Sequence, residues 1–507
     1  MNENYSPVLA MYDIRGKQEF IFRSQHIKEI IGGSAIIRDC YADYLKPCAE
    51  KYGKGIFGMN DNEKDIPFTE ADFMEHIESG YIGEIVYEGG GNFILLYKNV
   101  DYYKQITYDF TKMVLIEVGT LKILGSYIDN VNFEDYRGDN VRLYEKHRRD
   151  EAVSANAVPW GTLSIVQSDL RTSAPLVYKD RYEGKITKES KAKYDKYVKE
   201  SRNFSDEVNE QVLDNIVTKK GEDSNLAIVY IDGNSMGDKV QKCYIGGRSY
   251  ENCVRELRSF SKKIQKDYID DRKKDIDGAL AKLHPNDNGA KRRLILGAGD
   301  EINFICNASD AYALTKAYLK TLPENCSSCA GIAIFKSHAP YADAYRIAEE
   351  CCESGKTVMK KEEIEEISFV DFHYCQGAIG ISLEEIRQIE GTMNFSRPWM
   401  VRMEDKYSEK LQNITSVEEV EKLAGILNTF GRSNIKGLLS HAKKNSVDLR
   451  MELNRIVAHM PADKKSMDIF DMWREYDAVH GANAFPKLLY DTVLIYDLWF
   501  NDVKGDR

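Results

Sequence analysis

Residues 294–306, LILGAGDEINFIC, predict a strand, a tight turn and a second strand. The turn contains Gly297 and Gly299, and glycine tolerates the positive φ that a sharp bend requires. It also carries two neighbouring acids, Asp300 and Glu301, so an apolar hairpin presents two carboxylates at its tip. The strands and helices on either side of this hairpin decide the fold.

The hairpin lies within a regular alternation of strands and helices. A strand that ends at Asp232, in AIVYIDGNSMGD (227–238), and a long helix from about Tyr250 come before it. A helix, a strand and another helix follow, at residues 311–322, 330–335 and 339–352. Strand, helix, hairpin, helix, strand is the order of a ferredoxin-like sheet, which forms the palm of many polymerases and nucleotide cyclases.

The beginning of the chain repeats this order. It has an apolar strand, a helix with apolar residues at helical spacing, and a glycine-rich hairpin at residues 83–97. Pairing Asp13 with Asp232, and Gly91 with Asp300, aligns the two stretches after a small change in helix length. We therefore predict two palms in tandem. The alternative is a chance similarity between two α+β units.

The predicted fold class is α+β, with two tandem ferredoxin-like palm domains of the nucleotide cyclase or GGDEF type and a C-terminal helical bundle. The predicted domains are a first palm at 1–150, a linker or helical insert without zinc at 151–224, a second, catalytic palm at 225–394, and the helical domain at 395–507. The charge-dense linker predicts a solvated helix, and helical periodicity begins at about Ser396.

Length and composition limit the classes of protein. The 507 residues suffice for about three domains of ~150 residues each, and a net charge of −11 argues against a broad cationic surface for duplex nucleic acid. The chain has no signal-peptide pattern and no apolar span of ~20 residues, so we expect a cytoplasmic protein without membrane contact. The ten cysteines are scattered, and Cys326 and Cys329 lack the second pair that a zinc site needs.

Asp232, Asp300 and Glu301 are the candidate catalytic residues. Three carboxylates close together require a divalent cation, because like charges otherwise favour protonation. Mg²⁺ or Mn²⁺ prefers such oxygen ligands, and two ions ~4 Å apart can activate a hydroxyl and stabilise a leaving phosphate oxygen. Gly233 lets a triphosphate and a backbone carbonyl approach the metal. The alternatives are a helix-capping aspartate and a solvated hairpin tip.

Taken together, several segments resemble the large polymerase-like subunit of type III CRISPR effector complexes, a relative of GGDEF diguanylate cyclases and class III nucleotide cyclases. The segments are YDIRGKQEFIFRSQHIKEIIGGS (12–34), EGGGNFILLY (88–97), AIVYIDGNSMG (227–237), LGAGDEINF (296–304), AGIAIFKSHAPYADAYRIAEECCESGK (330–356) and LNTFGRSNIKGLLSHA (427–442). The resemblance is nearly end to end. It indicates a shortened form that lacks the N-terminal His-Asp nuclease domain and the zinc ribbon.

The resemblance implies that the second palm joins ATP into cyclic or linear oligoadenylates. Ala298-Gly299-Asp300-Glu301 stands where the family has Gly-Gly-Asp-Asp, and Glu301 keeps the charge one methylene further out. The implied metal ligands are Asp232, Gly233, Asp300 and Glu301, and the implied nucleotide contacts are Gly233, Asn234, Ser235, Gly299 and Lys356. Lys356 resembles a triphosphate-contacting lysine, and the alternative is a surface lysine that pairs with nearby glutamates.

The first palm resembles the inactive palm of the family. Gly91 and Asn92 stand where the acids are expected, which leaves Asp13 without carboxylate partners for two metals. Further predicted nucleotide contacts are Gly32, Gly33 and Ser34, which precede an apolar helical run and would offer backbone N–H groups or a hydroxyl. The alternative is a glycine turn with Ser34 as the helix N-cap.

The leading hypothesis is a metal-dependent nucleotidyltransferase that makes a second messenger from ATP in antiviral defence. The alternatives are a noncatalytic scaffold subunit of a guide-RNA complex and a stand-alone defence nucleotide cyclase. The expected partners are nucleoside triphosphates, CRISPR effector subunits with guide or target RNA bound through the C-terminal helices, and further copies of the chain.

Overall fold

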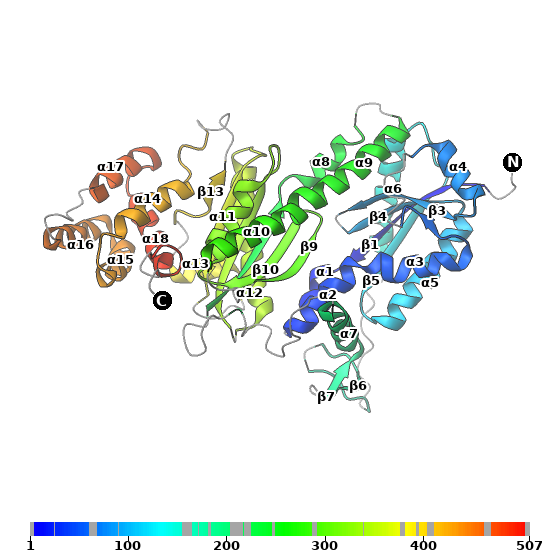
Figure 1. Cartoon of the computed structure of the whole chain (residues 1–507), viewed down its shortest axis with the longest axis horizontal. Coiled ribbons are helices and arrows are strands. Elements are labelled where there is room, and N and C mark those ends of the chain that lie inside the picture. Colours follow the sequence, from blue (N-terminus) through cyan, green and yellow to red (C-terminus); the bar gives the residue numbers. More distant parts are fainter. Residues whose placement is uncertain are drawn as a thin grey trace. The chain divides into compact units, whose positions relative to one another are not determined.

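The structure is a computed structural model, and Figure 1 labels its helices and strands in chain order. It describes residues 5–24, 26–59, 68–89, 91–154, 165–170, 172–180, 184–202, 216, 225–245, 249–285, 292–337, 339–375, 381–391, 395–402, 410–460 and 468–501. The chain forms two compact units. The first comprises residues 1–212, 235–269 and 295–300, and the second comprises 213–234, 270–294 and 301–507.

The sheet of the first unit has the strand order β2-β3-β4-β1-β5. Its strands are β1 (Val8–Arg15), β2 (Ile56–Phe57), β3 (Gly83–Gly89), β4 (Asn92–Tyr97) and β5 (Lys122–Ile128). Without the edge strand β2, the order β3-β4-β1-β5 is that of a ferredoxin-like sheet. Alternate residues of β1 enter two different cores, since Ala10 and Tyr12 pack into one and Leu9 and Met11 into the other. Burial on both faces explains why residues 8–12 of this strand are an uninterrupted apolar run.

Helices cover both faces of this sheet. They are α1 (Lys17–Phe22), α2 (Ile27–Arg38), α3 (Lys46–Ala49), α4 (Glu70–Glu78), α5 (Val100–Glu117), α6 (Tyr136–Val153), α7 (Lys188–Arg202), α8 (Met236–Lys242) and α9 (Tyr250–Ile264), with a small β6 (Leu176–Asp180) and β7 (Gly184–Thr187) hairpin. Leu257 of α9 lies in the same core as Leu9, and Arg258 donates to the buried carboxylate of Glu84 at 2.8 Å. Helix α9 therefore belongs to the first unit. The predicted boundaries at residues 150, 224 and 394 stay predictions.

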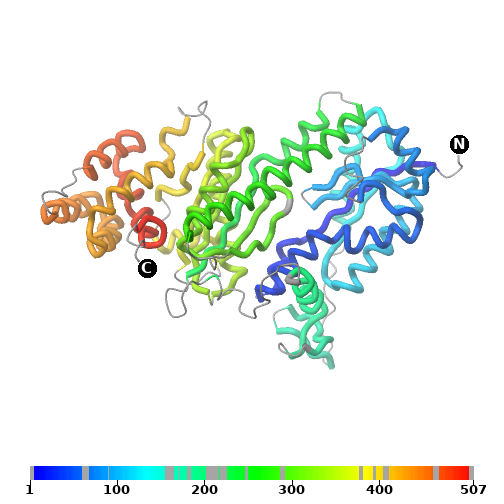
Figure 2. Tube along the Cα trace, in the orientation of Figure 1, coloured from blue at the N-terminus to red at the C-terminus, as the bar shows by residue number. Residues whose placement is uncertain are grey.

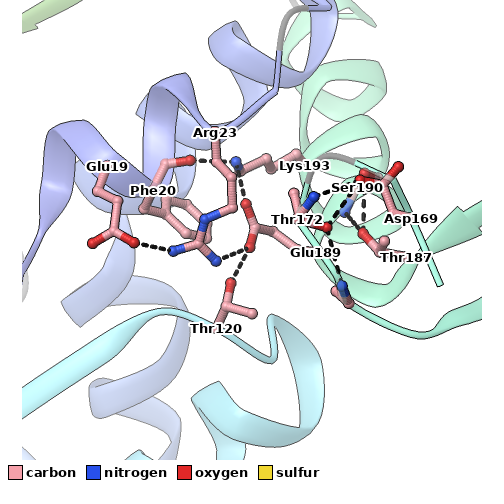
Figure 3. Close-up of polar contacts among 11 residues, drawn as sticks. Glu19, Phe20, Arg23, Thr120, Asp169, Thr172, Thr187, Glu189, Ser190 and Lys193 are labelled. Atoms are coloured by element: carbon pink, nitrogen blue, oxygen red, sulfur yellow. Dashed lines mark hydrogen bonds and ion pairs between the residues drawn. The ribbon is translucent and has the colours of Figure 1, made fainter. Parts of the chain in front are cut away.

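Helices α2 and α7 approach closely because glycines leave room between them. A Cβ on Gly32 would lie 1.8 Å from the carbonyl oxygen of Lys193. The Lys193 side chain is fully buried, and its ammonium donates to Glu189 at 2.6 Å and to the Phe20 carbonyl (Figure 3). Arg23 donates to the same glutamate at 3.0 Å, and burial lowers the pKa of Lys193. The predicted solvated helix thus has one buried, ion-paired face.

The predicted position of Gly32, Gly33 and Ser34 ahead of a helix is wrong, and so is the alternative of a glycine turn with Ser34 as the N-cap. Helix α2 begins at Ile27, with His26 as its N-cap residue, and all three predicted residues are buried inside the helix. Backbone N–H groups in a helix interior bond to the carbonyl four residues earlier. The backbone N–H groups of these residues are therefore used inside α2, and the predicted nucleotide contacts of the three residues stay predictions.

The close contact at Gly32 predicts a large difference between two helical glycines. Gly32→Ala is expected to lower the free energy of unfolding by about 1–3 kcal/mol, because the methyl group would overlap the Lys193 backbone. Gly437→Ala is the matched control in another helix, and no atom lies within 4 Å of its Cβ position. This control should raise stability by about 0.5–1 kcal/mol. Urea unfolding of both variants measures the difference, and equal effects would contradict the packing.

The sheet of the second unit has the strand order β13-β12-β11-β8-β10-β9. Its strands are β8 (Asn225–Gly233), β9 (Arg293–Ala298), β10 (Glu301–Asn307), β11 (Ser328–Lys336), β12 (Ser368–Tyr374) and β13 (Trp399–Arg402). The order β9-β10-β8-β11 is again ferredoxin-like, with β12 parallel to β11 at one side. The predicted α+β class with two such sheets is confirmed.

The remaining helices cover this sheet and form the C-terminal region. They are α10 (Asp271–Leu283), α11 (Ala311–Thr321), α12 (Tyr341–Lys361), α13 (Leu383–Glu390), α14 (Val417–Leu427), α15 (Arg432–Lys444), α16 (Ser446–His459), α17 (Asp468–His480) and α18 (Phe485–Trp499). Figure 2 shows α14 to α18 gathered at the C-terminal end, as the predicted bundle requires. None of the described helices combines the length and apolar character that a membrane span needs.

One strand lies where only helices were predicted. Trp399–Arg402 forms β13, which pairs antiparallel with β12. Its residues alternate between buried and half-buried, and Trp399 is fully buried. Four residues are too few to show a clear two-residue period, so the prediction missed this strand and extended the helical pattern that follows over it.

Candidate functional site

Asp232 and Glu301 occupy facing positions on neighbouring strands. Strands β8 and β10 are antiparallel with Ile231 opposite Ile302, so the next pair in register is Asp232 opposite Glu301. Facing residues of antiparallel strands point to the same side, with Cβ atoms about 5 Å apart. The two carboxylates therefore stand next to each other at the end of β8.

Lys356 is the cation of this site. It lies on α12, and its ammonium forms an ion pair with the Asp232 carboxylate. The two side chains are 21% and 25% exposed, so solvent reaches the pair but does not surround it. Burial alone would lower the pKa of Lys356, but the neighbouring Asp232 carboxylate outweighs it and raises that pKa. The residue predicted to contact a triphosphate thus lies beside the predicted catalytic aspartate.

Two tyrosines of α12 complete the surroundings of the acidic pair. The Tyr345 hydroxyl donates to Glu301 Oε1 at 3.3 Å, and one turn earlier the Tyr341 hydroxyl donates to Asn303 Oδ1 at 3.0 Å. The Tyr345 ring meets the Tyr230 ring edge-on, with centroids 5.5 Å apart. Burial raises the pKa of Tyr230, and the Glu301 carboxylate adds to the shift. Sequence reasoning missed these tyrosines, although their four-residue spacing places them on one helix face.

The hairpin turn contains only one of the two glycines that were predicted in it. Gly299 has a φ of 65°, whereas Gly297 lies within β9 and has no positive φ. Asp300 is the second turn residue and belongs to the first unit, while Asp232 and Glu301 belong to the second. The structure therefore brings together two predicted acids within one unit, and the role of Asp300 stays a prediction.

The residues after Asp232 differ from one another in their surroundings. Gly233 ends β8 opposite Ser328, at the edge where the acids stand. Asn234 is 2% exposed, and its amide donates to Ser327 Oγ at 3.0 Å and to the Ile367 carbonyl at 2.8 Å. The amide nitrogen of Asn234 is thus used inside the fold, and its predicted nucleotide contact stays a prediction. Ser235 precedes α8 with a φ of 56°, and its role stays a prediction.

A divalent cation fits this donor set only in part. Among the described residues, no three His, Cys, Asp or Glu side chains are arranged to hold a metal ion. Magnesium sites on nucleotides commonly use one or two protein carboxylates, and substrate phosphates supply further ligands. The facing carboxylates of Asp232 and Glu301 meet that requirement once Lys356 moves off Asp232. The pair therefore suits a cation that arrives with phosphate better than a bare ion.

The first sheet has a different group at the same register position. Asp13 faces Asn92, an amide, as the sequence predicts. Three positive or protonatable groups approach the Asp13 carboxylate, namely Arg15 at 3.0 Å, Lys17 at 3.8 Å and His147 at 3.9 Å. Burial would raise the pKa of Asp13, but these neighbours outweigh it and lower that pKa. Protein side chains thus neutralise this aspartate.

The two sheets and the C-terminal helices define a tandem ferredoxin-like α+β protein, and the pair of Asp232 and Glu301 lies on its second sheet. No protein-family model matches the chain, and no curated protein matches its sequence. Its structure is similar to a Csm1-Csm4 cassette in complex with pppApApA, with a TM-score of 0.50 and 13% identity over 97% of this chain and 70% of that chain. A Csm1-Csm4 subcomplex of the type III-A CRISPR-Csm interference complex gives a TM-score of 0.49 and 12% identity over the same 97% and 70%. At this identity the first similarity shows a shared fold.

Proposed function

We propose that this chain is a metal-dependent nucleotidyltransferase of the type III CRISPR polymerase-like kind, which converts ATP into cyclic or linear oligoadenylates. The observation that carries the proposal is the facing pair of Asp232 and Glu301 with Lys356 beside it. Phosphoryl-transfer sites combine carboxylates for a cation with a lysine for phosphate. The shared fold with a Csm1-Csm4 cassette solved in complex with pppApApA supports this substrate class.

The residues of the chain would position two nucleotides for an in-line displacement. Asp232 and Glu301, together with Asp300, would hold Mg²⁺ or Mn²⁺, which when bound activates a hydroxyl and neutralises phosphate charge. Lys356 would bind a phosphate of the incoming triphosphate, and Gly233 leaves space for it at the end of β8. The 3′ hydroxyl oxygen of one nucleotide bonds to the α-phosphorus of the next, and pyrophosphate leaves. Catalysis by positioning requires no covalent nucleophile.

Association with other effector subunits is part of the proposal. Helix α16 exposes Val447 and Met451, each to 68%, one turn apart on the same face. Arg450 lies between them and is also exposed. Methionine and arginine are enriched at protein interfaces, so we propose this face of α16 as the surface that another effector subunit would contact. The same face would serve a noncatalytic scaffold subunit, which is the second candidate function.

A turnover assay tests the proposal. Wild-type protein incubated with ATP and Mg²⁺ or Mn²⁺ is expected to release pyrophosphate and to form adenylate oligomers detectable by mass spectrometry. Asp300→Ala should lower the rate about 100-fold, because it removes a predicted cation ligand while Glu301 remains. Unchanged pyrophosphate release from Asp300→Ala would refute the assignment of this acid. Wild-type protein that makes no product but co-purifies with RNA would instead support the scaffold function.

A further inference from the structure

Helix α12 supplies a partner to each carboxylate of the acidic pair. Lys356 contacts Asp232, and Tyr345 donates to Glu301 at 3.3 Å. The helix packs closely on the sheet, since a Cβ on Gly331 of β11 would lie 1.8 Å from the Ala348 carbonyl oxygen. Both contacts therefore come from one helix that packs on the sheet carrying the two acids.

The two partners differ in what they allow. A hydroxyl that donates to a carboxylate can remain in place when that carboxylate also binds a metal, as outer partners of metal ligands commonly do. An ammonium in direct contact with a carboxylate cannot remain in place when a metal binds, because it repels a divalent cation at the same oxygen. Tyr345 is thus compatible with a cation at the pair, whereas Lys356 in its present position opposes one.

The facing carboxylates explain why Lys356 adopts this position. Two like charges on facing side chains repel each other, and a nearby positive charge removes most of that repulsion. A triphosphate carries more negative charge than a single carboxylate and binds lysine readily. Lys356 therefore has reason to remain on Asp232 in the absence of nucleotide and to move to phosphate in its presence.

We propose that Lys356 makes divalent-cation binding at Asp232 dependent on a nucleoside triphosphate, by occupying the carboxylate until phosphate draws it away. This inference rests on the proposed function, since it assumes that the acidic pair takes a cation together with a nucleotide. Free cation would bind weakly, and cation and triphosphate would bind together. By linkage, each ligand strengthens the binding of the other by the same factor.

The test uses Mn²⁺ as the probe and measures binding, not turnover. Electron paramagnetic resonance counts free Mn²⁺ with and without an ATP analogue that has a methylene group between its α- and β-phosphorus atoms. Lys356→Met is expected to bind Mn²⁺ alone about tenfold more tightly than wild type, because its competitor is gone. The same variant should bind the Mn²⁺ complex of the analogue about tenfold more weakly, because a phosphate partner is lost.

Two further variants make the result decisive. Lys360→Met lies one turn further along α12, is 74% exposed and pairs with Glu353, so it should change neither affinity. Lys356→Gln keeps a polar side chain, and opposite changes in its two affinities would support the inference even if the methionine variant folded poorly. This inference alone is overturned if the wild-type protein binds the Mn²⁺ complex of the analogue but both Lys356 variants bind Mn²⁺ alone with the wild-type affinity. Failure of wild type to bind the complex overturns the proposed function as well.

Discussion

Asp232→Asn is expected to slow product formation from ATP by about 10³-fold or more, which corresponds to about 4 kcal/mol of lost transition-state stabilisation. The replacement keeps the shape of the side chain at the end of β8 but removes its charge. Asp232 faces Glu301 and contacts Lys356, so the loss affects the arrangement for both cation and phosphate. Pyrophosphate release under saturating ATP and Mn²⁺ measures the effect.

Asp13→Asn is the matched control for this experiment. Asp13 occupies the same register position on the first sheet, but it faces Asn92 and is neutralised by Arg15 and Lys17. Its replacement should leave the rate within about twofold of wild type, because Asp13 faces an amide and has no facing carboxylate with which to share a cation. Equal losses in the two variants would show that both sheets take part in the chemistry. A normal rate in Asp232→Asn would remove the aspartate from the site.

Asp491→Leu is expected to lower the free energy of unfolding by about 3–5 kcal/mol, because it leaves the buried Arg397 guanidinium without its counter-charge. Asp491 of α18 is fully buried, lies 3.0 Å from Arg397 Nε, and accepts bonds from the backbone and hydroxyl of Ser396. Arg397 is 3% exposed and stacks over the Phe372 ring at 4.2 Å. The pair therefore connects the last helix to the segment before β13.

The comparison for this variant lies on the same helix. Asp497 pairs with Arg432 and Lys436 at 2.9 Å, but those cations are 61% and 59% exposed. Asp497→Leu should cost less than about 1 kcal/mol, because solvent screens the pair. Urea unfolding followed by tryptophan fluorescence suits the measurement, since Trp399, Trp473 and Trp499 all lie in the second unit. Adding Arg397→Met to Asp491→Leu should recover much of the loss, and a purely additive result would contradict the ion-pair explanation.

Local sequence patterns were sufficient for the order of the strands. The apolar runs of β8 and β10, and Gly299 between β9 and β10, can be recognised in the sequence because strand period and turn chemistry are short-range properties. The positive φ of Gly299 follows from the same chemistry.

Other features depended on residues far away in the chain. Gly32 and Gly33 predict a turn, since glycine weakens an isolated helix, yet they lie inside α2 because Lys193 packs on them. Asn234 resembles a site residue by its place after Asp232, but Ser327 and Ile367 turn its amide inward. In both cases tertiary packing outweighs the local preference.

The sequence by itself determined which acids end the strands of the second sheet, because hydrophobic alternation and turn residues act over a few positions. Only the tertiary structure decided that Asp232 faces Glu301, that Lys356 neutralises Asp232 and that the Tyr345 hydroxyl donates to Glu301. Those contacts depend on strand register and on the position of α12 on the sheet. Both arise from packing between segments that are far apart in the sequence.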